Sequence, residues 1–451
     1  MVRGRSLRGR RGWRLPVVVV VAVVGALGLG ACSSSSSSPP AAAPSASGSA
    51  SGTIVWSASP INTTGKDVRQ VLISDFEKQY PNIKVSLVSA PTDTDTNRAT
   101  LATEISGGSS TPDVYMGDVI WPAQFGEHGL ALPLSKYLPS SFFSQFAPGL
   151  VSGASYKGQV YGSPMFEDQG FLYYRKDLLA KEGLSVPTTW QQLEADSVKL
   201  VKAGLVKYGF VWEGDSYEGL TCDFMEYLTD AGGSVTNGAY TSASLNTPAA
   251  STALTFMRSL ITSGASPSAV TTFQEPQAMT AFADGQAAFL RNWDYAYADS
   301  QTPSTSKVVG KVGVAPLPTF AGQAYPGYSN IGGWNLYINP HSKNIAADLD
   351  FIKFMASNEA QDVLSVQYSE IPTTTAVRDS AQVIAENPVL ATVPKTKLIA
   401  RPAGTPNYPA LSTAIYTNVN AALAGSTSVS SALSAAQSQA TSALTSPAGG
   451  L

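Results

Sequence analysis

The sequence predicts an α/β protein built from two lobes, and three observations support this prediction. Apolar side chains alternate at strand spacing in some segments and recur at helical spacing in others, in turn along the chain. The folded region opens in the order strand, helix, strand, which is typical of a parallel sheet. The chain has 451 residues, of which 43% are hydrophobic and 14% charged. That length is enough for about two or three domains.

The first elements form a βαβ unit. Residues 53–59, TIVWSAS, are rich in strand-forming side chains, and residues 67–80 carry apolar side chains on one helical face. The alternation of Ile83 and Val85 then predicts a second strand over residues 83–88.

The rest of the chain continues this alternation. A helix around residues 96–106 precedes a strand at 112–119, and Thr188 and Gln191 have the spacing of a capping box at the start of another helix. That helix is expected to turn four apolar side chains toward a core: Trp190, Leu193, Val198 and Val201. Further helices are predicted over residues 219–231, 248–263, 276–290, 344–357 and 429–444.

The N-terminus is typical of an exported lipoprotein. A basic segment precedes a short apolar run, which is the pattern of a secretory signal peptide over residues 1–31. The tetrapeptide ending in Cys32 (LGAC) resembles a bacterial lipobox, which implies that Cys32 is lipidated. An ordinary signal peptide with an incidental cysteine is the alternative, and Arg10-Arg11 leaves twin-arginine export open beside the general secretory route. Residues 32–52, rich in Ser, Ala and Pro, have the composition of a flexible tether.

The charge balance argues against nucleic acid as a partner. The formal net charge of −3 includes six arginines within the first 31 residues, and the remaining chain holds 23 basic against 32 acidic residues, a balance of −9. Binding to nucleic acid depends on lysine and arginine neutralising phosphates.

The sequence lacks the residue patterns of common catalytic and metal sites. It contains two cysteines, Cys32 and Cys222, and two isolated histidines, so we expect no metal site and no cofactor, and Cys222 is expected to be a free thiol. No phosphate-binding loop, nucleophile elbow or dinucleotide fingerprint occurs. The acidic spacing from Asp93 to Glu104 resembles a calcium loop, but Arg98 stands where that loop needs glycine. Capping of the following helix explains Asp93 better.

Aromatic residues beside polar ones recur at separated points along the chain. Each aromatic residue alone is more often a core residue than a binding residue, but these sit in segments that also hold Gly, Pro or Asp. Sugars suit such a set, because their CH-bearing faces stack on aromatic rings while their hydroxyls bond to polar side chains. The segments are GDVIWP, the pair Phe166 and Asp168, VWEGDSY, RNWDYAY, GGW and ARPAGTPNY.

Longer motifs resemble one protein family over residues 53 to 445. The runs YKGQVYGSP, FLYYRKDLLAKEGLSVPTTWQQL, FADGQAAFLRNWDYAYA, VGVAPLPTF and GGWNLYINPHSKNIAADLDFIKFMAS occur in the order found in the extracellular solute-binding proteins (family 1) of ABC sugar importers. Within that family, MGDVIWPAQF, VWEGDSYEGLTCDF and RPAGTPNY are most similar to the trehalose/maltose-binding branch.

The resemblance implies a periplasmic-binding-protein-like fold of type II. Each lobe would hold a mostly parallel sheet flanked by helices, with the ligand cleft between the lobes. Residues 53–164 with 315–355 would form the first lobe, and residues 165–314 with 356–446 the second.

The resemblance also implies the ligand contacts and the setting. At position 166 the family pattern implies a tyrosine, and this chain has Phe166 instead. No ligand contact is assigned within residues 57–64, SASPINTT. The protein would not be an enzyme: it would act as a monomer on the extracellular face of the membrane, anchored through Cys32, and would pass its sugar to ABC permease subunits. The implied ligand-binding residues are Asp118, Phe166, Asp168, Trp293, Tyr295, Gly333, Trp334 and Arg401.

Three alternatives remain at this point. A secreted glycoside hydrolase would use Glu167 and Asp168 as its acid pair, but neighbours on a strand point to opposite faces and cannot flank one bond. A protein of the same fold could bind another oligosaccharide or a non-sugar solute such as a peptide, a polyamine or iron. A structural or adhesive surface protein would not explain the aromatic residues in loops.

Overall fold

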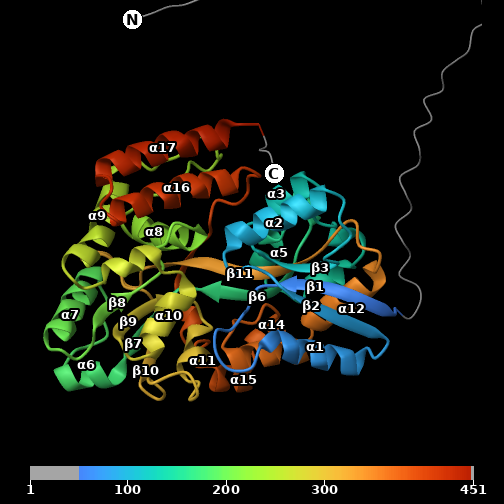
Figure 1. Ribbon diagram of the computed structural model, residues 1–451, viewed down its shortest axis with the longest axis horizontal. Helices are drawn as coiled ribbons and strands as arrows, with labels where there is room; N and C mark the ends of the chain where they lie inside the picture. Colours follow the sequence, from blue (N-terminus) through green and yellow to red (C-terminus); the bar gives the residue numbers. More distant parts are fainter. Residues whose placement is uncertain (1–49, 448–451) are drawn as a thin grey trace, which may run out of the picture. The chain divides into compact units, whose positions relative to one another are not determined.

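The computed structural model describes residues 50–447, all of which belong to one compact unit (Figure 1). The predicted signal peptide, Cys32 and most of the predicted tether lie outside the described residues. Within the described part of the chain, no helix has the length and apolar character needed to cross a bilayer.

The first lobe contains a six-stranded sheet in the order β12-β11-β3-β1-β2, with β6 also paired to β11. Strand β1 pairs in parallel with both β2 and β3, and α1 (Val68–Gln79) connects β1 to β2, so the predicted βαβ unit is confirmed. The strands are β1 (Gly52–Ala58), β2 (Ile83–Ser89), β3 (Val114–Asp118), β6 (Ser163–Gln169), β11 (Tyr328–Ile338) and β12 (Lys397–Ile399).

Aromatic packing holds α1 and α12 (Ile345–Met355) on the first sheet. The Phe351 ring of α12 lies edge-on to Trp56 of β1 at 5.2 Å and to Phe76 of α1 at 5.0 Å, and all three are fully buried. Such buried rings contribute both area and preferred ring geometry to stability. The other helices of this part of the chain are α2 (Thr94–Ser106), α3 (Pro122–Glu127), α4 (Ser140–Phe143) and α5 (Pro148–Gly153).

The second lobe contains a four-stranded sheet in the order β10-β7-β9-β8. Here the prediction of a mostly parallel sheet needs correction, because β8 and β9 are parallel but β7 is antiparallel to both β9 and β10. The reason is that β7 and β10 are the strands by which the chain enters this sheet from β6 and leaves it toward β11. The strands are β7 (Phe171–Arg175), β8 (Tyr208–Val211), β9 (Ala287–Asn292) and β10 (Val312–Ala315).

Helices surround the second sheet, and α16 and α17 lie side by side beyond α8 and α9 (Figure 1). The apolar stripe predicted for the last helix is buried from Leu433 to Leu444, whereas Val429 is half-buried. These helices are α6 (Lys176–Glu182), α7 (Trp190–Lys202), α8 (Glu218–Asp230), α9 (Pro248–Thr262), α10 (Glu275–Ala283), α11 (Ala296–Ser300), α16 (Tyr408–Leu423) and α17 (Val429–Thr445).

The chain passes between the sheets at Gly170, which separates β6 from β7. A Cβ atom there would lie 2.7 Å from Arg291 Nη2 and from Glu226 Oε1, so the backbone approaches a buried ion pair too closely for a larger residue. A last crossing runs through the short helices α13 (Asn358–Asp362), α14 (Thr375–Arg378) and α15 (Ala381–Glu386).

Two strands pair outside the lobe to which the sequence assigns their residues. Both β6 and β12 join β11 in the first sheet, although residues 165–169 and 397–399 fall within the predicted second lobe. The predicted lobe boundaries themselves remain predictions.

Two local expectations were wrong. Thr189, not Thr188, caps α7, because its side chain accepts a hydrogen bond from Gln192 N. As expected, Val198 and Val201 of α7 pack against the core, although both are only half-buried, and Leu200 is fully buried beside them. The helix predicted over residues 276–290 ends as α10 near Gly285, whose φ of +74° closes the helix, and the following apolar run forms β9.

Asp93 behaves as expected. It is the N-cap residue of α2 and accepts a hydrogen bond from Thr96 N at 2.7 Å.

Candidate ligand-binding site

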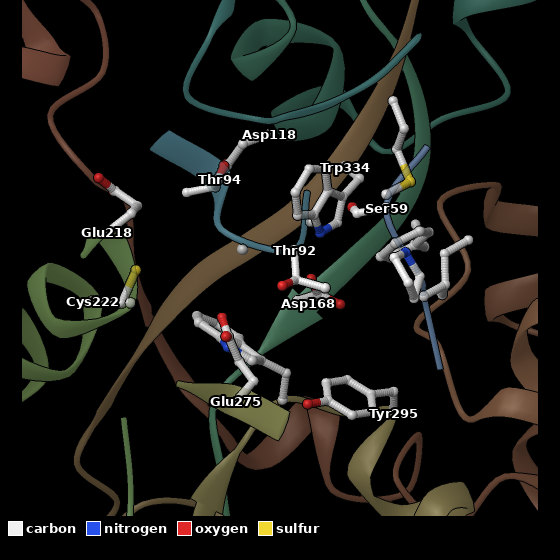
Figure 2. A pocket seen from close by; sticks show the side chains of 18 of the residues that line it. Ser59, Thr92, Thr94, Asp118, Asp168, Glu218, Cys222, Glu275, Tyr295 and Trp334 are labelled. Carbon is white, nitrogen blue, oxygen red and sulfur yellow. The ribbon is translucent and has the colours of Figure 1, made fainter. Parts of the chain in front are cut away.

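A cavity with about 890 Å³ of space, including its opening to solvent, lies between the two sheets. Side chains from both lobes line it, and Figure 2 shows Asp118, Trp334, Asp168 and Glu275 around a common space. All eight residues predicted to bind ligand line this one cavity, namely Asp118, Phe166, Asp168, Trp293, Tyr295, Gly333, Trp334 and Arg401.

Arg401 lies between two carboxylates on one wall. Its Nη2 bonds to Asp118 Oδ1 at 2.7 Å, and its Nη1 bonds to Asp118 Oδ2 and to Glu218 Oε1, both at 3.0 Å. Glu218 also accepts hydrogen bonds from the Tyr408 and Ser412 hydroxyls, each at 2.5 Å. The guanidinium charge is therefore shared among protein carboxylates, and only Nε lacks a partner.

Burial controls the protonation of this cluster. It raises the pKa of the Glu218 carboxyl above its usual value, and the neighbouring Arg401 charge opposes that rise. The Arg401 pKa lies well above its ordinary value, because the surrounding acidic groups outweigh the effect of burial. Arg401 thus remains charged, and its position depends on both acids.

A buried ion cluster fixes the aromatic wall formed by Trp293. The Arg291 guanidinium lies 4.1 Å from the centre of the Trp293 ring. Arg291 in turn bonds to Glu213 at 2.7 Å and to Glu226 at 2.6 Å, with Asp223 at 3.0 Å. A cation over an indole face is attracted by the ring's quadrupole. The indole is thus held in place by Arg291, and Trp293 also lines the cavity.

Strand β11 brings three cavity residues into register. Trp334 is opposite Asp118 of β3 on one side and Phe166 of β6 on the other, with a register shift after Trp334. Gly333 has a φ of +117°, and a Cβ there would lie 2.6 Å from Phe166 O. Only glycine fits this close approach.

The pleat of β6 separates the two adjacent acids. Asp168 lines the cavity, whereas Glu167 bonds through Oε2 to Arg378 at 2.6 Å and accepts a hydrogen bond from Gln169 at 2.7 Å. The two carboxylates therefore do not face one ligand, as the alternation along a strand predicts.

Sequence reasoning missed several polar residues of the cavity. Ser59 follows β1 and Thr92 follows β2, so both lie in loops at the carboxyl ends of parallel strands, where ligands of open α/β sheets bind. That rule could have identified them. Thr63 and Thr94 lie in or beside the same two loops, and Tyr217 belongs to the segment VWEGDSY that the sequence had singled out. The others come from separate segments with no comparable local pattern: Glu218, Cys222, Glu275 and Glu370.

Cys222 is a buried free thiol, as expected, and it packs against Trp293 and Tyr295 in the cavity wall. Burial raises its pKa well above the usual value, so the thiol stays protonated.

Comparison with known proteins identifies the family. The model of the bacterial extracellular solute-binding protein family matches residues 59–362. The chain belongs to this family. A probable ABC transporter-binding protein of Deinococcus radiodurans is 35% identical over 327 residues, which cover 71% of this chain and 76% of the relative. This solute-binding protein also shares 26% identity with a maltooligosaccharide ABC transporter solute-binding lipoprotein of Streptococcus pneumoniae, over 60% of this chain and 62% of that protein.

Solved structures agree with the two-lobed fold. Maltose-bound MalE3 of T. maritima superposes with a TM-score of 0.79 at 33% identity, covering 86% of this chain and 98% of that chain. The family and the fold inferred from the sequence are thus confirmed. The family and these neighbours are solute-binding transport proteins.

Proposed function

We propose that this protein captures a sugar, a disaccharide such as trehalose or maltose, and delivers it to the permease of an ABC importer. The observation that carries this proposal is that all eight predicted sugar contacts line one cavity. Four of them are aromatic, which suits the CH-bearing faces of sugar rings. The MalE3 neighbour binds maltose, and the pneumococcal relative is named for maltooligosaccharide.

Each wall of the cavity has a distinct role in this proposal. Trp293 and Tyr295 stack against the sugar from the second lobe, and Trp334 does so from the first. Asp168 accepts hydrogen bonds from hydroxyls, since its Oδ1 is buried without a partner. Asp118 and Arg401 form an ion pair in which each side chain balances the charge of the other. The two side chains therefore bind hydroxyls together.

Binding favours the closed arrangement in this proposal because each lobe alone covers one face of the sugar. A ligand shifts the open–closed equilibrium by its difference in affinity for the two states. The permease then recognises the closed form.

We further propose that a lipid on Cys32 anchors the monomeric protein at the extracellular face of the membrane. The LGAC motif supports this, and so does the pneumococcal relative, which is named a lipoprotein. Mass spectrometry of the protein extracted from membranes would show the acyl groups. A protein released unmodified into the medium would contradict the anchor.

Thermal unfolding of the full chain in detergent tests the sugar proposal. Bound ligand raises the free energy of unfolding by RT ln(1 + [L]/Kd) and thereby the melting midpoint. Trehalose, maltose and maltotriose should each be compared with an amino acid and a polyamine. Stabilisation by polyamine but by none of the sugars would transfer the proposal to a non-sugar solute. Incubation with the same sugars should release no hydrolysis product, and product formation would favour a glycoside hydrolase.

Replacing Asp168 gives a residue-level test of the same proposal. Asp168→Ala should weaken sugar binding by at least about tenfold, roughly 1.4 kcal/mol. Asp75, which pairs with the exposed Lys78 on α1 and does not line the cavity, provides the control Asp75→Ala. Equal affinity of the two variants by calorimetry would remove Asp168 from the site.

A further inference from the structure

Among the described residues, the cavity is lined by more carboxyl groups than its one arginine can pair with. Five carboxyl groups line it, and two of them, Asp118 and Glu218, share Arg401. Among the described residues, the other three form no ion pair with any lysine, arginine or histidine; they are Asp168, Glu275 and Glu370.

Two of these unpaired acids meet a third one at one end of the cavity. Asp168 of β6, Asp294 of the turn after β9, and Glu370 of the segment after the π-helical turn Val363–Gln367 each place a carboxyl oxygen within 4.8 Å of the other two. Asp168 and Glu370 line the cavity, and all three side chains are at least nine-tenths buried, with 8%, 0% and 1% exposed.

Each acid of this group also has an oxygen that no protein donor reaches. Asp168 Oδ1, Asp294 Oδ1 and Glu370 Oε2 are buried without a hydrogen-bond partner. The backbone amide of Ile371 donates to Asp294 Oδ2 at 2.8 Å. The nearby Tyr173 hydroxyl donates to backbone carbonyls instead. Because buried polar groups are nearly always paired, three such oxygens at a ligand cavity need either protons shared among the acids or a donor or cation supplied by a ligand.

The neighbouring arginines are committed elsewhere. Arg378 pairs with Glu167, and Arg291 pairs with acids behind Trp293. Burial raises the pKa of all three carboxyls, to about 7 for Asp168. Repulsion by Asp168 raises the pKa of Asp294 further, and repulsion by Asp294 and Asp168 raises that of Glu370.

We propose that Asp168, Asp294 and Glu370 form a cation-binding subsite within the sugar cavity. Two sources could supply the cation, and the first rests on the proposed function: a primary ammonium group on an amino sugar. An ammonium offers three N–H donors, one for each carboxylate of the subsite. The second source is a divalent metal such as Ca²⁺, which needs six to eight oxygens and would take the remainder from sugar hydroxyls and water. The number of acceptors therefore favours the amine.

Calorimetry at pH 7.5 on the full chain, freed of metal with a chelator, separates these sources. In the amine arm, glucosamine is compared with glucose and N-acetylglucosamine, and chitosan disaccharide with cellobiose. In the metal arm, CaCl₂ is titrated without sugar. We expect the amine of at least one pair to bind about tenfold or more tightly than its neutral counterpart, or CaCl₂ to bind alone.

Two isosteric variants assign the effect to the subsite. Asp294→Asn and Glu370→Gln should each reduce binding of the cationic probe by about tenfold while changing neutral-sugar affinity less than about twofold. Glu275→Gln is the matched control, since it removes an unpaired acid of the same cavity that lies outside the subsite. Because the variants remove buried like charges, their ligand-free melting temperatures should not fall.

The proposal is overturned if no amine binds more tightly than its neutral counterpart and CaCl₂ gives no heat. It is also overturned if both variants weaken neutral and charged sugars equally, since the acids would then only shape the cavity. If neutral sugars bind normally in either case, the proposed sugar function stands. If no sugar binds at all, the proposed function fails, and the CaCl₂ arm still decides the subsite.

Discussion

The role of a single arginine changes once its partners are known. From the sequence, Arg401 was expected only to be one of the ligand-binding residues. The structure places the Arg401 guanidinium in buried ion pairs with both Asp118 and Glu218. Glu218 lies 183 positions away in the chain, so only the fold brings the two together. No local pattern could have predicted the pairing.

Replacing Arg401 should therefore cost stability as well as affinity. Arg401→Gln leaves Asp118 and Glu218 buried beside each other, and breaking a buried ion pair costs about 3–5 kcal/mol of unfolding free energy. Urea denaturation measures this loss. Lys157→Gln breaks the exposed pair with Glu127 and should give no measurable change. An unchanged urea midpoint in Arg401→Gln would show that solvent reaches the pair.

Asp348 makes stability depend on pH. Burial raises the pKa of this carboxyl to about 7, opposed by a hydrogen bond from Ser342. Its folded-state pKa exceeds the unfolded value of 3.8, so the folded state keeps this carboxyl protonated up to a higher pH than the unfolded state does. The contribution of Asp348 to the unfolding free energy is full below about pH 4 and is lost as the pH rises to about 7.

The variant Asp348→Asn removes this titration. From pH 5 to pH 8, the native chain should lose about 2 kcal/mol more unfolding free energy than the variant does. Urea titrations at both pH values give this difference directly. Asp95, Asp168 and Asp230 also have raised pKa values and remain in both proteins, so they largely cancel in the comparison. Equal losses would show that Asp348 does not titrate in this range.

At the scale of elements, the spacing of apolar residues predicted the helices and strands that depend on local sequence alone. The opening βαβ unit and the last helix follow apolar repeats, and both were found as expected. The predicted helix over 276–290 failed because the polar turn at Asp284, Gly285 and Gln286 ends α10 and separates it from the apolar run that follows. Sheet pairing converts that second half into β9. The sequence did not predict the antiparallel strands of the second sheet. Their direction depends on where the chain crosses between the lobes, which apolar spacing does not reveal.

Strand β11 offers a test of how close packing positions the cavity. Gly333→Ala should destabilise the fold and weaken sugar binding, because its Cβ would meet Phe166 O at 2.6 Å. Gly322→Ala is the control: its φ of +90° imposes a similar backbone strain, but nothing lies within 4 Å of the new Cβ. The difference in melting temperature isolates the steric contact. If both variants have the same melting temperature, β6 and β11 can move apart without loss of stability.

At the scale of the whole molecule, hydrogen bonds join the rims of the two lobes. Thr63 and Thr64, in the loop after β1, donate to Asp299 of α11 through Thr63 N at 3.0 Å, Thr64 Oγ1 at 2.8 Å and the Thr63 hydroxyl. On the other rim, Glu218 N donates to Asp95 Oδ2 at 3.2 Å. These hydrogen bonds form only when the two lobes are closed on each other.

Asp299→Ala should therefore speed release of the sugar. The change removes three hydrogen bonds that exist only when the lobes meet, so the closed state loses population and the dissociation rate should rise by about tenfold or more. Stopped-flow measurement of sugar release gives this rate. Asp284→Ala, which breaks a pair with Lys307 inside the second lobe, should leave it unchanged. The same rate in both variants would mean that the rim bonds do not govern opening.

The aromatic wall of the cavity has a practical consequence. Trp293 and Trp334 both face the space that the sugar would fill, and Arg291 holds the Trp293 indole in one orientation. Occupancy replaces water beside these rings, so the emission of the unmodified protein should shift in colour and intensity. The chain would then work as a label-free optical sensor for its own ligand, suited to screening sugars in a plate reader.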